Sequence, residues 1–188
     1  PTDLVVRRLW NSGEYQRHTI ECRIPKFAMP AILIDGNAIA RNERTQLKLR
    51  AEALAARSIA PGLAVVLVGE DPASKIYVRN KARACAELGL RSEVLELAAT
   101  TSQQTLLDHI ARLNADRATH GILVQLPLPK HIDAAAVVEA IALDKDVDGF
   151  SLHNLGALVA GRALFPPCTP FGVMRMLEHH AIALPGQN

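Results

Sequence analysis

The chain has 188 residues, of which 49% are hydrophobic and 21% are charged, which is the balance of a globular protein with a packed core. The formal net charge of +2 is carried entirely by residues 1–28, so the rest of the chain is neutral and gives no electrostatic reason to expect nucleic acid or an anionic membrane as a partner. No apolar run approaches the roughly 20 residues of a membrane span, and the first residues lack the basic-then-apolar order of a signal peptide. The cysteines are widely separated, as is typical of reduced thiols in a cytoplasmic protein.

Residues 1–28 differ from the rest of the chain because they show no sustained helical or strand period. We interpret them as an extension that does not belong to the fold; an ordered arm is the alternative. A first domain is therefore expected over residues 29–180, and residues 181–188 are expected to begin a link to a further domain.

After this extension, apolar runs and amphipathic segments alternate. In chain order, the pattern predicts a short strand near 30–35, a helix over 37–58, a strand over 63–68, a helix from an N-cap at Ser74 to Leu88, a strand over 94–97, a helix capped by Thr101 or Ser102, a strand over 121–126, a helix over 133–143, an irregular stretch over 144–167 and a helix over 169–180. This alternation favours an α/β fold, with a mostly parallel sheet and helices on both faces, in three αβα layers.

The helix that follows the strand over 63–68 carries the first candidate site residues. Tyr77 and Lys81 are four residues apart, so they project from one helix face, with Ser74 one turn earlier. A tyrosine ring offers a flat stacking surface, and a lysine beside it can transfer protons. The same spacing also fits an ordinary half-exposed helix, so the spacing alone leaves both interpretations open.

A second candidate segment ends the strand over 121–126. Gln125 stands where sheet meets cleft, and its amide can both donate and accept hydrogen bonds. Pro127 and Pro129 restrict the backbone that follows and remove two donors. The alternative is that Gln125 only satisfies loose backbone groups.

Acidic residues form a third segment. Asp144, Asp146 and Asp148 could attract a hard cation, but the other ligands of a calcium loop are absent from the sequence, so we expect no metal. A carboxylate that recognises a donor-rich heterocycle and an ordinary acidic turn are the interpretations that remain. Cys168 lies in a proline-rich loop without an identified base partner, so we do not expect it to be a nucleophile.

Four ordered segments together resemble one family. They are GEDPASKIYVRNKARAC over 69–85, GILVQLPLP over 121–129, DKDVDGF over 144–150 and PCTP over 167–170. From about residue 29 to residue 188 the chain is similar to the bacterial bifunctional methylenetetrahydrofolate dehydrogenase/methenyltetrahydrofolate cyclohydrolase. One such motif would be a weak signal, whereas four in the same order make the resemblance specific.

The resemblance implies a role for each candidate residue. Tyr77 matches the tyrosine that stacks on the folate, and Asp148 matches the aspartate that holds the pterin ring by hydrogen bonds. Lys81 matches the lysine central to the cyclohydrolase step, and Gln125 matches the glutamine that hydrogen-bonds this lysine and helps to set its protonation state. The expected catalytic residues are thus Lys81, Gln125 and Tyr77, and the residues expected to bind the substrate are Tyr77, Asp148, Ser74, Gln125 and Pro127.

The resemblance also implies an activity. This activity is oxidation of 5,10-methylenetetrahydrofolate with NADP and hydrolysis of the 5,10-methenyl product to 10-formyltetrahydrofolate, in one-carbon metabolism and purine biosynthesis. A cytoplasmic homodimer without a metal is expected. The family continues into a Rossmann dinucleotide-binding domain, whereas no G-x-G-x-x-G run occurs in these 188 residues, so we expect that domain to be absent from this chain. The alternatives are a catalytically silent folate-binding or dimerisation module and an unrelated α/β protein whose motifs are structural loops.

Overall fold

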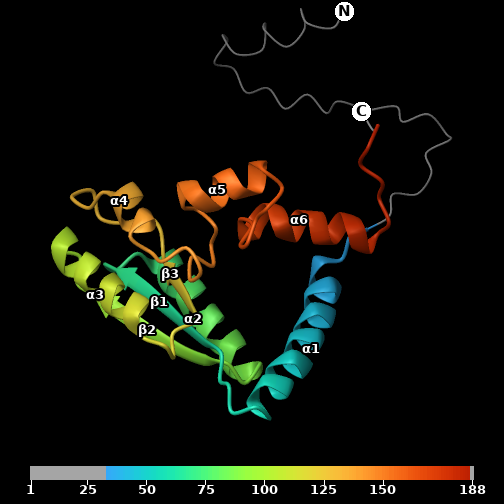
Figure 1. Ribbon diagram of the computed structural model, residues 1–188, viewed down its shortest axis with the longest axis horizontal. Helices are drawn as coiled ribbons and strands as arrows, with labels where there is room; N and C mark the ends of the chain where they lie inside the picture. The colour runs from blue at the N-terminus through green and yellow to red at the C-terminus, as the bar shows by residue number, and fades with distance from the viewer. Residues whose placement is uncertain (1–32, 187–188) are drawn as a thin grey trace, which may run out of the picture. The chain divides into compact units, whose positions relative to one another are not determined.

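The computed structural model describes residues 33–186. Its elements are α1 (Gly36–Ala55), β1 (Gly62–Val68), α2 (Pro72–Glu87), β2 (Arg91–Leu97), α3 (Gln103–Ala115), β3 (Gly121–Val124), α4 (Ala134–Glu139), α5 (Leu152–Val159) and α6 (Cys168–His179) (Figure 1). Residues from Ile34 onward form one compact unit. The expected extension over 1–28 lies outside the described residues, as does most of the strand expected near 30–35; Leu33 to Asp35 are not in a strand.

A parallel sheet of three strands, in the order β2-β1-β3, lies at the centre of this unit. β1 is the middle strand, and Val66 is in register with Leu95 of β2 on one side and Val124 of β3 on the other. Both neighbours run in the same direction as β1, so each pair requires a crossover, which helices provide. The prediction of an α/β fold with a parallel sheet is therefore confirmed.

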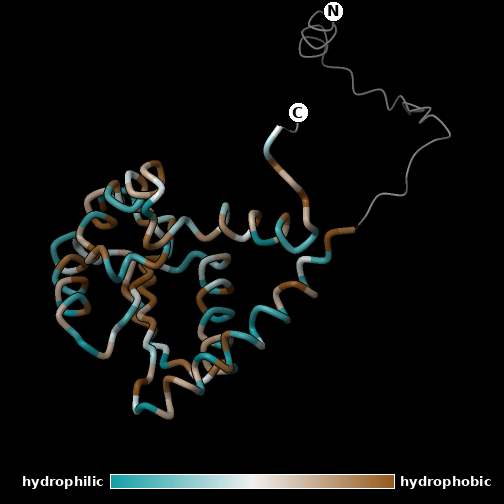
Figure 2. Tube along the Cα trace, turned by 45° about the vertical axis from the view of Figure 1, so that its right-hand side comes forward, coloured by the Kyte–Doolittle hydropathy of each residue, from teal (hydrophilic) through white to brown (hydrophobic). Residues whose placement is uncertain are grey.

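Helices cover both faces of the sheet because successive side chains of β1 point in opposite directions. Val66 packs with Leu106 and Ile110 of α3 and with Val137 of α4. Val65 packs on the other face, against α2. Figure 1 shows α3 and α2 on opposite sides of the strands, and Figure 2 shows hydrophobic residues concentrated in the strands between them. The predicted three αβα layers are confirmed.

The start of α2 differs from the prediction. Asp71, not Ser74, is the N-cap, and its Oδ1 accepts a hydrogen bond of 2.7 Å from the backbone N–H of Ser74. Pro72 occupies the first turn, where its missing N–H costs nothing. The Asp-Pro pair is itself a helix-start signal, so the sequence contained the correct position. The cap expected at Ser102 is confirmed, since Ser102 Oγ accepts from the backbone N–H of Thr105 at 3.1 Å.

The region between β3 and α6 differs from the prediction in two places. α4 stops at Glu139, earlier than the predicted helix over 133–143. The irregular stretch expected over 144–167 contains α5, which begins after Ser151; Ser151 Oγ accepts from the backbone N–H of Asn154 at 3.2 Å. Within residues 33–186, no helix has both the length and the apolar character that a membrane crossing requires.

Candidate functional site

Three predicted segments meet at one edge of the sheet. Because β1 and β3 are parallel, their carboxyl ends point to the same edge, where α2 and the segment from Gln125 begin. A parallel bridge between Ile122 and Asp146 places the acidic segment beside β3. Asp148, two residues further along, is thereby carried towards the same edge as Gln125. The topology thus brings residues about 20 to 70 positions apart in sequence into one region.

Lys81 and Gln125 are in direct contact. Lys81 Nζ donates a hydrogen bond of 3.0 Å to Gln125 Oε1, and both side chains are half-buried. Gln125 is held in place from two directions: its backbone N–H donates to the carbonyl of Val66 at 2.8 Å, and its Nε2 donates to the carbonyl of Leu126 at 2.8 Å. The amide oxygen that faces the lysine is therefore anchored to the sheet, and it limits where the amine can move.

The two other α2 residues have different surroundings. Tyr77 is 60% exposed, so its ring is open to a stacking partner. Ser74 is buried, and its backbone N–H and hydroxyl both lower the pKa of Asp71 by hydrogen bonding to that carboxylate. Ser74 therefore supports the start of the helix, and its expected contact with a substrate stays a prediction.

Asp148 is a half-buried acid beside a cation. Burial raises the pKa of its carboxyl above the ordinary value, and the positive charge of Lys81 acts in the opposite direction. The negative charge of Asp146 adds a smaller upward contribution. Asp148 and Lys81 thus influence each other across the site, although they do not form an ion pair within 4.0 Å among the described residues.

The Asp146 carboxylate is engaged in hydrogen bonds within its own segment. Both oxygens of Asp146 already accept hydrogen bonds, from Gly149 and Ser151 backbone N–H groups and from the Asn154 side chain. In the part of the chain that the structure describes, no group of three or more His, Cys, Asp or Glu side chains could hold a metal ion. Asp146 is thus a buried acid bonded by its own loop, which the sequence pattern did not distinguish from its neighbours.

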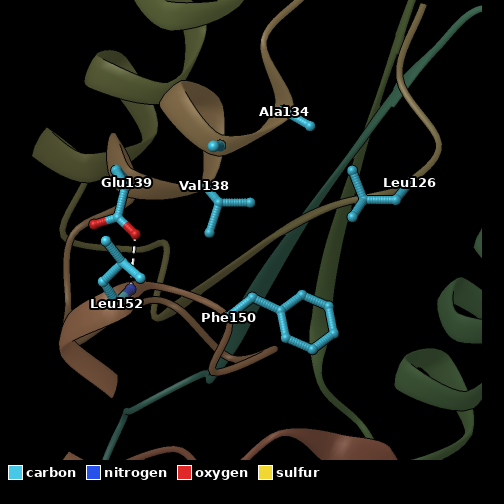
Figure 3. Close-up of a pocket in the computed structure, with 7 residues that line it drawn as sticks. Leu126, Ala134, Val138, Glu139, Phe150 and Leu152 are labelled. Atoms are coloured by element: carbon cyan, nitrogen blue, oxygen red, sulfur yellow. Dashed lines mark hydrogen bonds between the residues drawn. The ribbon is translucent and has the colours of Figure 1, made fainter. Parts of the chain in front are cut away.

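A largely apolar cavity of about 410 Å³ adjoins the segment after Gln125. Leu126, Val138 and Phe150 reach into it from three different segments, and Figure 3 shows these side chains around one space. Glu139 Oε1 accepts a hydrogen bond of 2.7 Å from the backbone N–H of Leu152 at its margin. Its lining residues do not include the lysine, tyrosine, glutamine and aspartate predicted for the site. We therefore centre the site on those polar residues.

Pro127 follows Gln125 by two residues and is exposed. The peptide bond between Leu126 and Pro127 is cis.

Cys168 lies in the second proline-rich segment, over 166–170. Its thiol donates a hydrogen bond to the carbonyl of Val147 at 3.3 Å, although the residue as a whole is exposed. Burial of the thiol and the negative charge of Asp148 raise the pKa of Cys168, which keeps it protonated at neutral pH and disfavours a nucleophilic role.

Sequence reasoning missed the residues that support the acidic segment. Lys145 Nζ donates to three backbone carbonyls at the end of α3, those of Leu113, Asn114 and Asp116, at 2.7 to 3.0 Å. Asn154, at the start of α5, bonds Asp146 from the other side. A serine at 151 followed by leucines at 152, 155 and 158 is the signal that could have predicted α5.

Comparison with known proteins identifies a family. Residues 34–148 match the family described as tetrahydrofolate dehydrogenase/cyclohydrolase, catalytic domain. The bifunctional protein FolD of Burkholderia cenocepacia is 58% identical over 160 residues, which are 85% of this chain and 56% of that protein. The bifunctional protein FolD of Nitrosospira multiformis is 51% identical over 160 residues, with the same shares covered. The chain thus spans about half the length of the curated relatives it matches.

Solved structures lead to the same family. The bifunctional FolD methylenetetrahydrofolate dehydrogenase/cyclohydrolase of Campylobacter jejuni superposes with a TM-score of 0.79 and 45% identity, over 80% of this chain and 54% of that one. The Trypanosoma brucei enzyme, complexed with NADP cofactor and inhibitor, gives a TM-score of 0.81 and 36% identity, over 85% of this chain and 55% of that one. Since the family match alone covers more than half of the residues, the chain belongs to the tetrahydrofolate dehydrogenase/cyclohydrolase family.

Proposed function

We propose that this chain forms the folate-binding, catalytic-lysine side of an enzyme that oxidises 5,10-methylenetetrahydrofolate with NADP and hydrolyses the 5,10-methenyl product to 10-formyltetrahydrofolate. The observation that carries the proposal is the hydrogen bond of 3.0 Å between Lys81 and Gln125, at the sheet edge to which Asp148 also belongs. Family membership and the names of the relatives support it.

The hydrolysis step explains why a tethered lysine is useful. Water adds its oxygen to the methenyl carbon and loses a proton; a carbon–nitrogen bond then breaks as the nitrogen takes up a proton and the hydroxyl gives up its own, which leaves the formyl carbonyl and releases one proton overall. In its neutral form, an amine near the reacting carbon can receive the first proton, and the cation so formed can deliver the second. Gln125 Oε1 keeps Lys81 Nζ within a small region. Confinement of this kind lowers the entropic cost of reaching the reactive geometry.

Recognition of the folate is assigned to the two residues that flank the lysine. The pterin ring presents neighbouring N–H donors, and a carboxylate such as Asp148 accepts hydrogen bonds of this kind. The exposed ring of Tyr77 offers a face on which the flat part of a folate can stack. Ser74 and Pro127 are proposed as further residues of the substrate site. Tetrahydrofolate derivatives are accordingly the proposed small-molecule partners.

Among the described residues, the start of α2 does not fit the diphosphate of a dinucleotide. In a dinucleotide-binding unit, the diphosphate lies at the N-terminus of the helix that follows the first strand. Here that helix, α2, begins at Asp71, whose carboxylate already accepts the free backbone N–H of Ser74 and would repel a phosphate. The NADP of the proposed oxidation is therefore not assigned to α2, the first such helix within residues 33–186.

Hydrolysis of 5,10-methenyltetrahydrofolate by this chain, followed as loss of the methenyl absorbance, tests the proposal. Lys81→Met is expected to lower the rate by about 10² to 10⁴, the usual contribution of a general acid–base group. Lys75→Met is the matched control, because Lys75 lies on the same helix but pairs with Glu70 in solvent. Equal rates for wild type and Lys81→Met would remove the lysine from the mechanism.

A catalytically silent folate-binding module is the second candidate. The observation that favours it is that the exposed Tyr77 ring and the half-buried Asp148 carboxyl could hold a folate without any proton transfer by the lysine. Calorimetric titration with 5-formyltetrahydrofolate separates the two functions: tight binding without hydrolysis supports the module, and binding with lysine-dependent hydrolysis supports the enzyme.

We also propose a cytoplasmic homodimer that acts in one-carbon metabolism and supplies purine biosynthesis, as the family resemblance implies. Sedimentation equilibrium tests the oligomeric state, because a dimer has twice the mass of the 20.4 kDa chain. A single species at the monomer mass across micromolar concentrations would refute the dimer.

A further inference from the structure

Asp146 is the most completely enclosed acid among the described residues, and the proposed chemistry does not use it. Its side chain is 1% exposed. Its Oδ1 accepts from the backbone N–H of Gly149 at 3.1 Å, and its Oδ2 accepts from the backbone N–H of Ser151 at 3.0 Å and from Asn154 Nδ2 at 2.9 Å. Every donor lies within the next eight residues, so one carboxylate fastens the loop over 147–151 to the start of α5.

Asn154 links this carboxylate to the chain that precedes it. The side chain is 1% exposed, and Nδ2 donates to the carbonyl of Leu143 at 3.4 Å as well as to Asp146. Its backbone N–H is held by Ser151, the buried N-cap of α5. Asn154 therefore ties the segment before the loop, the loop itself and the helix after it into one hydrogen-bonded unit.

The residue that this unit encloses is Asp148. The chain is fixed two residues before it, where Asp146 is bonded, and immediately after it, at Gly149. Gly149 has φ +68°, and a Cβ at this position would overlap the carbonyl oxygen of Phe165. With the backbone held on both sides by hydrogen bonds and by a close approach, the Asp148 side chain has a restricted set of orientations.

The surroundings of Asp146 and Asp148 shift the pKa values of the two carboxyls in opposite directions. Burial opposes ionisation of Asp146, but the hydrogen bonds from Asn154 and Ser151 outweigh it, and the pKa of Asp146 lies below its ordinary value. The charged groups that influence Asp148 are Lys81 and the ionised Asp146, and the Asp148 charge in turn raises the pKa of the neighbouring Cys168 thiol. Asp146 thus presents a permanent negative charge behind Asp148, and Lys81 presents a positive one on another side.

We propose that Asp146 and Asn154 are positioning residues of the folate site, which hold the Asp148 carboxylate in the orientation that binds the substrate. The inference rests on the proposed function, because it takes Asp148 to be the group that contacts the folate. The two residues themselves are buried, each only 1% exposed. They act through Asp148, and this indirect action separates a positioning role from a merely structural one.

A double-mutant cycle tests this dependence. The variants are Asn154→Leu, Asp148→Ala and the double variant, and the measured quantity is the Kd of the full chain for 5-formyltetrahydrofolate by calorimetry. Asn154→Leu is expected to weaken binding about tenfold when Asp148 is present and to have no effect in the Asp148→Ala background. The same loss in both backgrounds, or none in either, would overturn the proposal.

Asn114→Leu is the matched control for stability. Asn114 also bridges two segments, since its Nδ2 donates to the carbonyl of Ala140 at 2.8 Å and its Oδ1 accepts from the backbone N–H of Ala142 at 2.9 Å. This variant is expected to lower the Tm without changing the Kd. A parallel loss of affinity in Asn114→Leu would show that general destabilisation, and not the position of Asp148, weakens binding.

A ligand-free measurement keeps this inference separate from the proposed function. The titration of the Asp148 carboxyl, followed by carbon NMR, is expected to shift towards lower pH in Asp146→Asn, which keeps the shape of the side chain. The same shift is expected in Asn154→Leu, because a looser loop gives Asp148 more solvent. An unchanged titration in both folded variants refutes the positioning role. If the wild-type chain binds no folate and the titration still moves, the folate site fails and the positioning of Asp148 stands.

Discussion

The two halves of the candidate site are positioned by different physical means. Lys81 and Gln125 lie on regular elements, a helix and the end of a strand, and their separation follows from how α2 packs on the sheet. Asp148 lies on a loop whose shape depends on buried side-chain hydrogen bonds. A helix tolerates the loss of one contact, because its backbone bonds remain. A polar network of this kind loses its geometry when one member is removed.

The largest effect that would sharpen this contrast is expected for Gly149→Ala. A left-handed φ of +68° and an overlap with the Phe165 carbonyl oxygen together predict a loss of about 3 kcal/mol or more in the free energy of unfolding. Gly161→Ala is the control, because Gly161 also has φ +68° but has open space where a Cβ would lie. Urea denaturation measures both. Equal losses in the two variants would show that the contact with Phe165 is unimportant.

Asp148→Ala separates binding from chemistry. Removal of the carboxylate is expected to weaken folate binding by about 1.5–3 kcal/mol for a charge-assisted hydrogen bond, with little loss of stability. The stability is retained because burial raises the pKa of this acid, so the ionised group is itself unfavourable in the folded chain. Calorimetry with 5-formyltetrahydrofolate and thermal unfolding give the two quantities. An unchanged affinity would take Asp148 out of the site.

The smallest effects are expected in the pH dependence of stability, where the two acids of one loop differ in sign. The pKa of Asp146 is lowered from 3.8, so this carboxylate stabilises the fold above that value and its contribution is lost as pH falls through the lower folded pKa. The pKa of Asp148 is raised from 3.8, so its protonation stabilises the fold as pH falls through the higher folded pKa.

Asp146→Asn is therefore expected to flatten the fall in stability towards acid, and Asp148→Asn is expected to steepen it. Free energies of unfolding between about pH 6 and pH 3 measure the difference. Asp71 and Asp116, whose pKa values are also lowered, are present in both variants and cancel in the comparison. The same dependence of the free energy of unfolding on pH in both variants would mean that the pKa values of Asp146 and Asp148 are not shifted in opposite directions.

Most of the architecture was predictable from sequence, because it depends on local patterns. The apolar run over 63–68 predicted the central strand, and its alternating faces follow from the strand period. Boundaries were less certain where two signals compete. The helix start was assigned to Ser74 because serine is a good cap, whereas Asp71 followed by proline is the pair that the structure uses.

In the candidate site, too, some residues could be predicted from local sequence patterns and others could not. Tyr77, Lys81 and Gln125 could be named because their segments are regular and their order matches the family motifs, and their catalytic roles remain predictions. Asp146 and Asn154 could not be distinguished, because an acid in a turn and a polar residue in a short helix have the same pattern whether buried or exposed. Their burial arises only when β3, α4 and α5 enclose them.

By itself, then, the sequence determined the alternation of strands and helices, the parallel sheet that this alternation requires and the polar residues that stand at its carboxyl edge. Tertiary structure alone decided which of three nearby aspartates is buried and bonded by α5, namely Asp146, and which lies near the lysine, namely Asp148. The reason is physical: hydrophobic periodicity is a property of neighbouring residues, whereas the desolvation and pairing of a charge depend on every segment that packs around it.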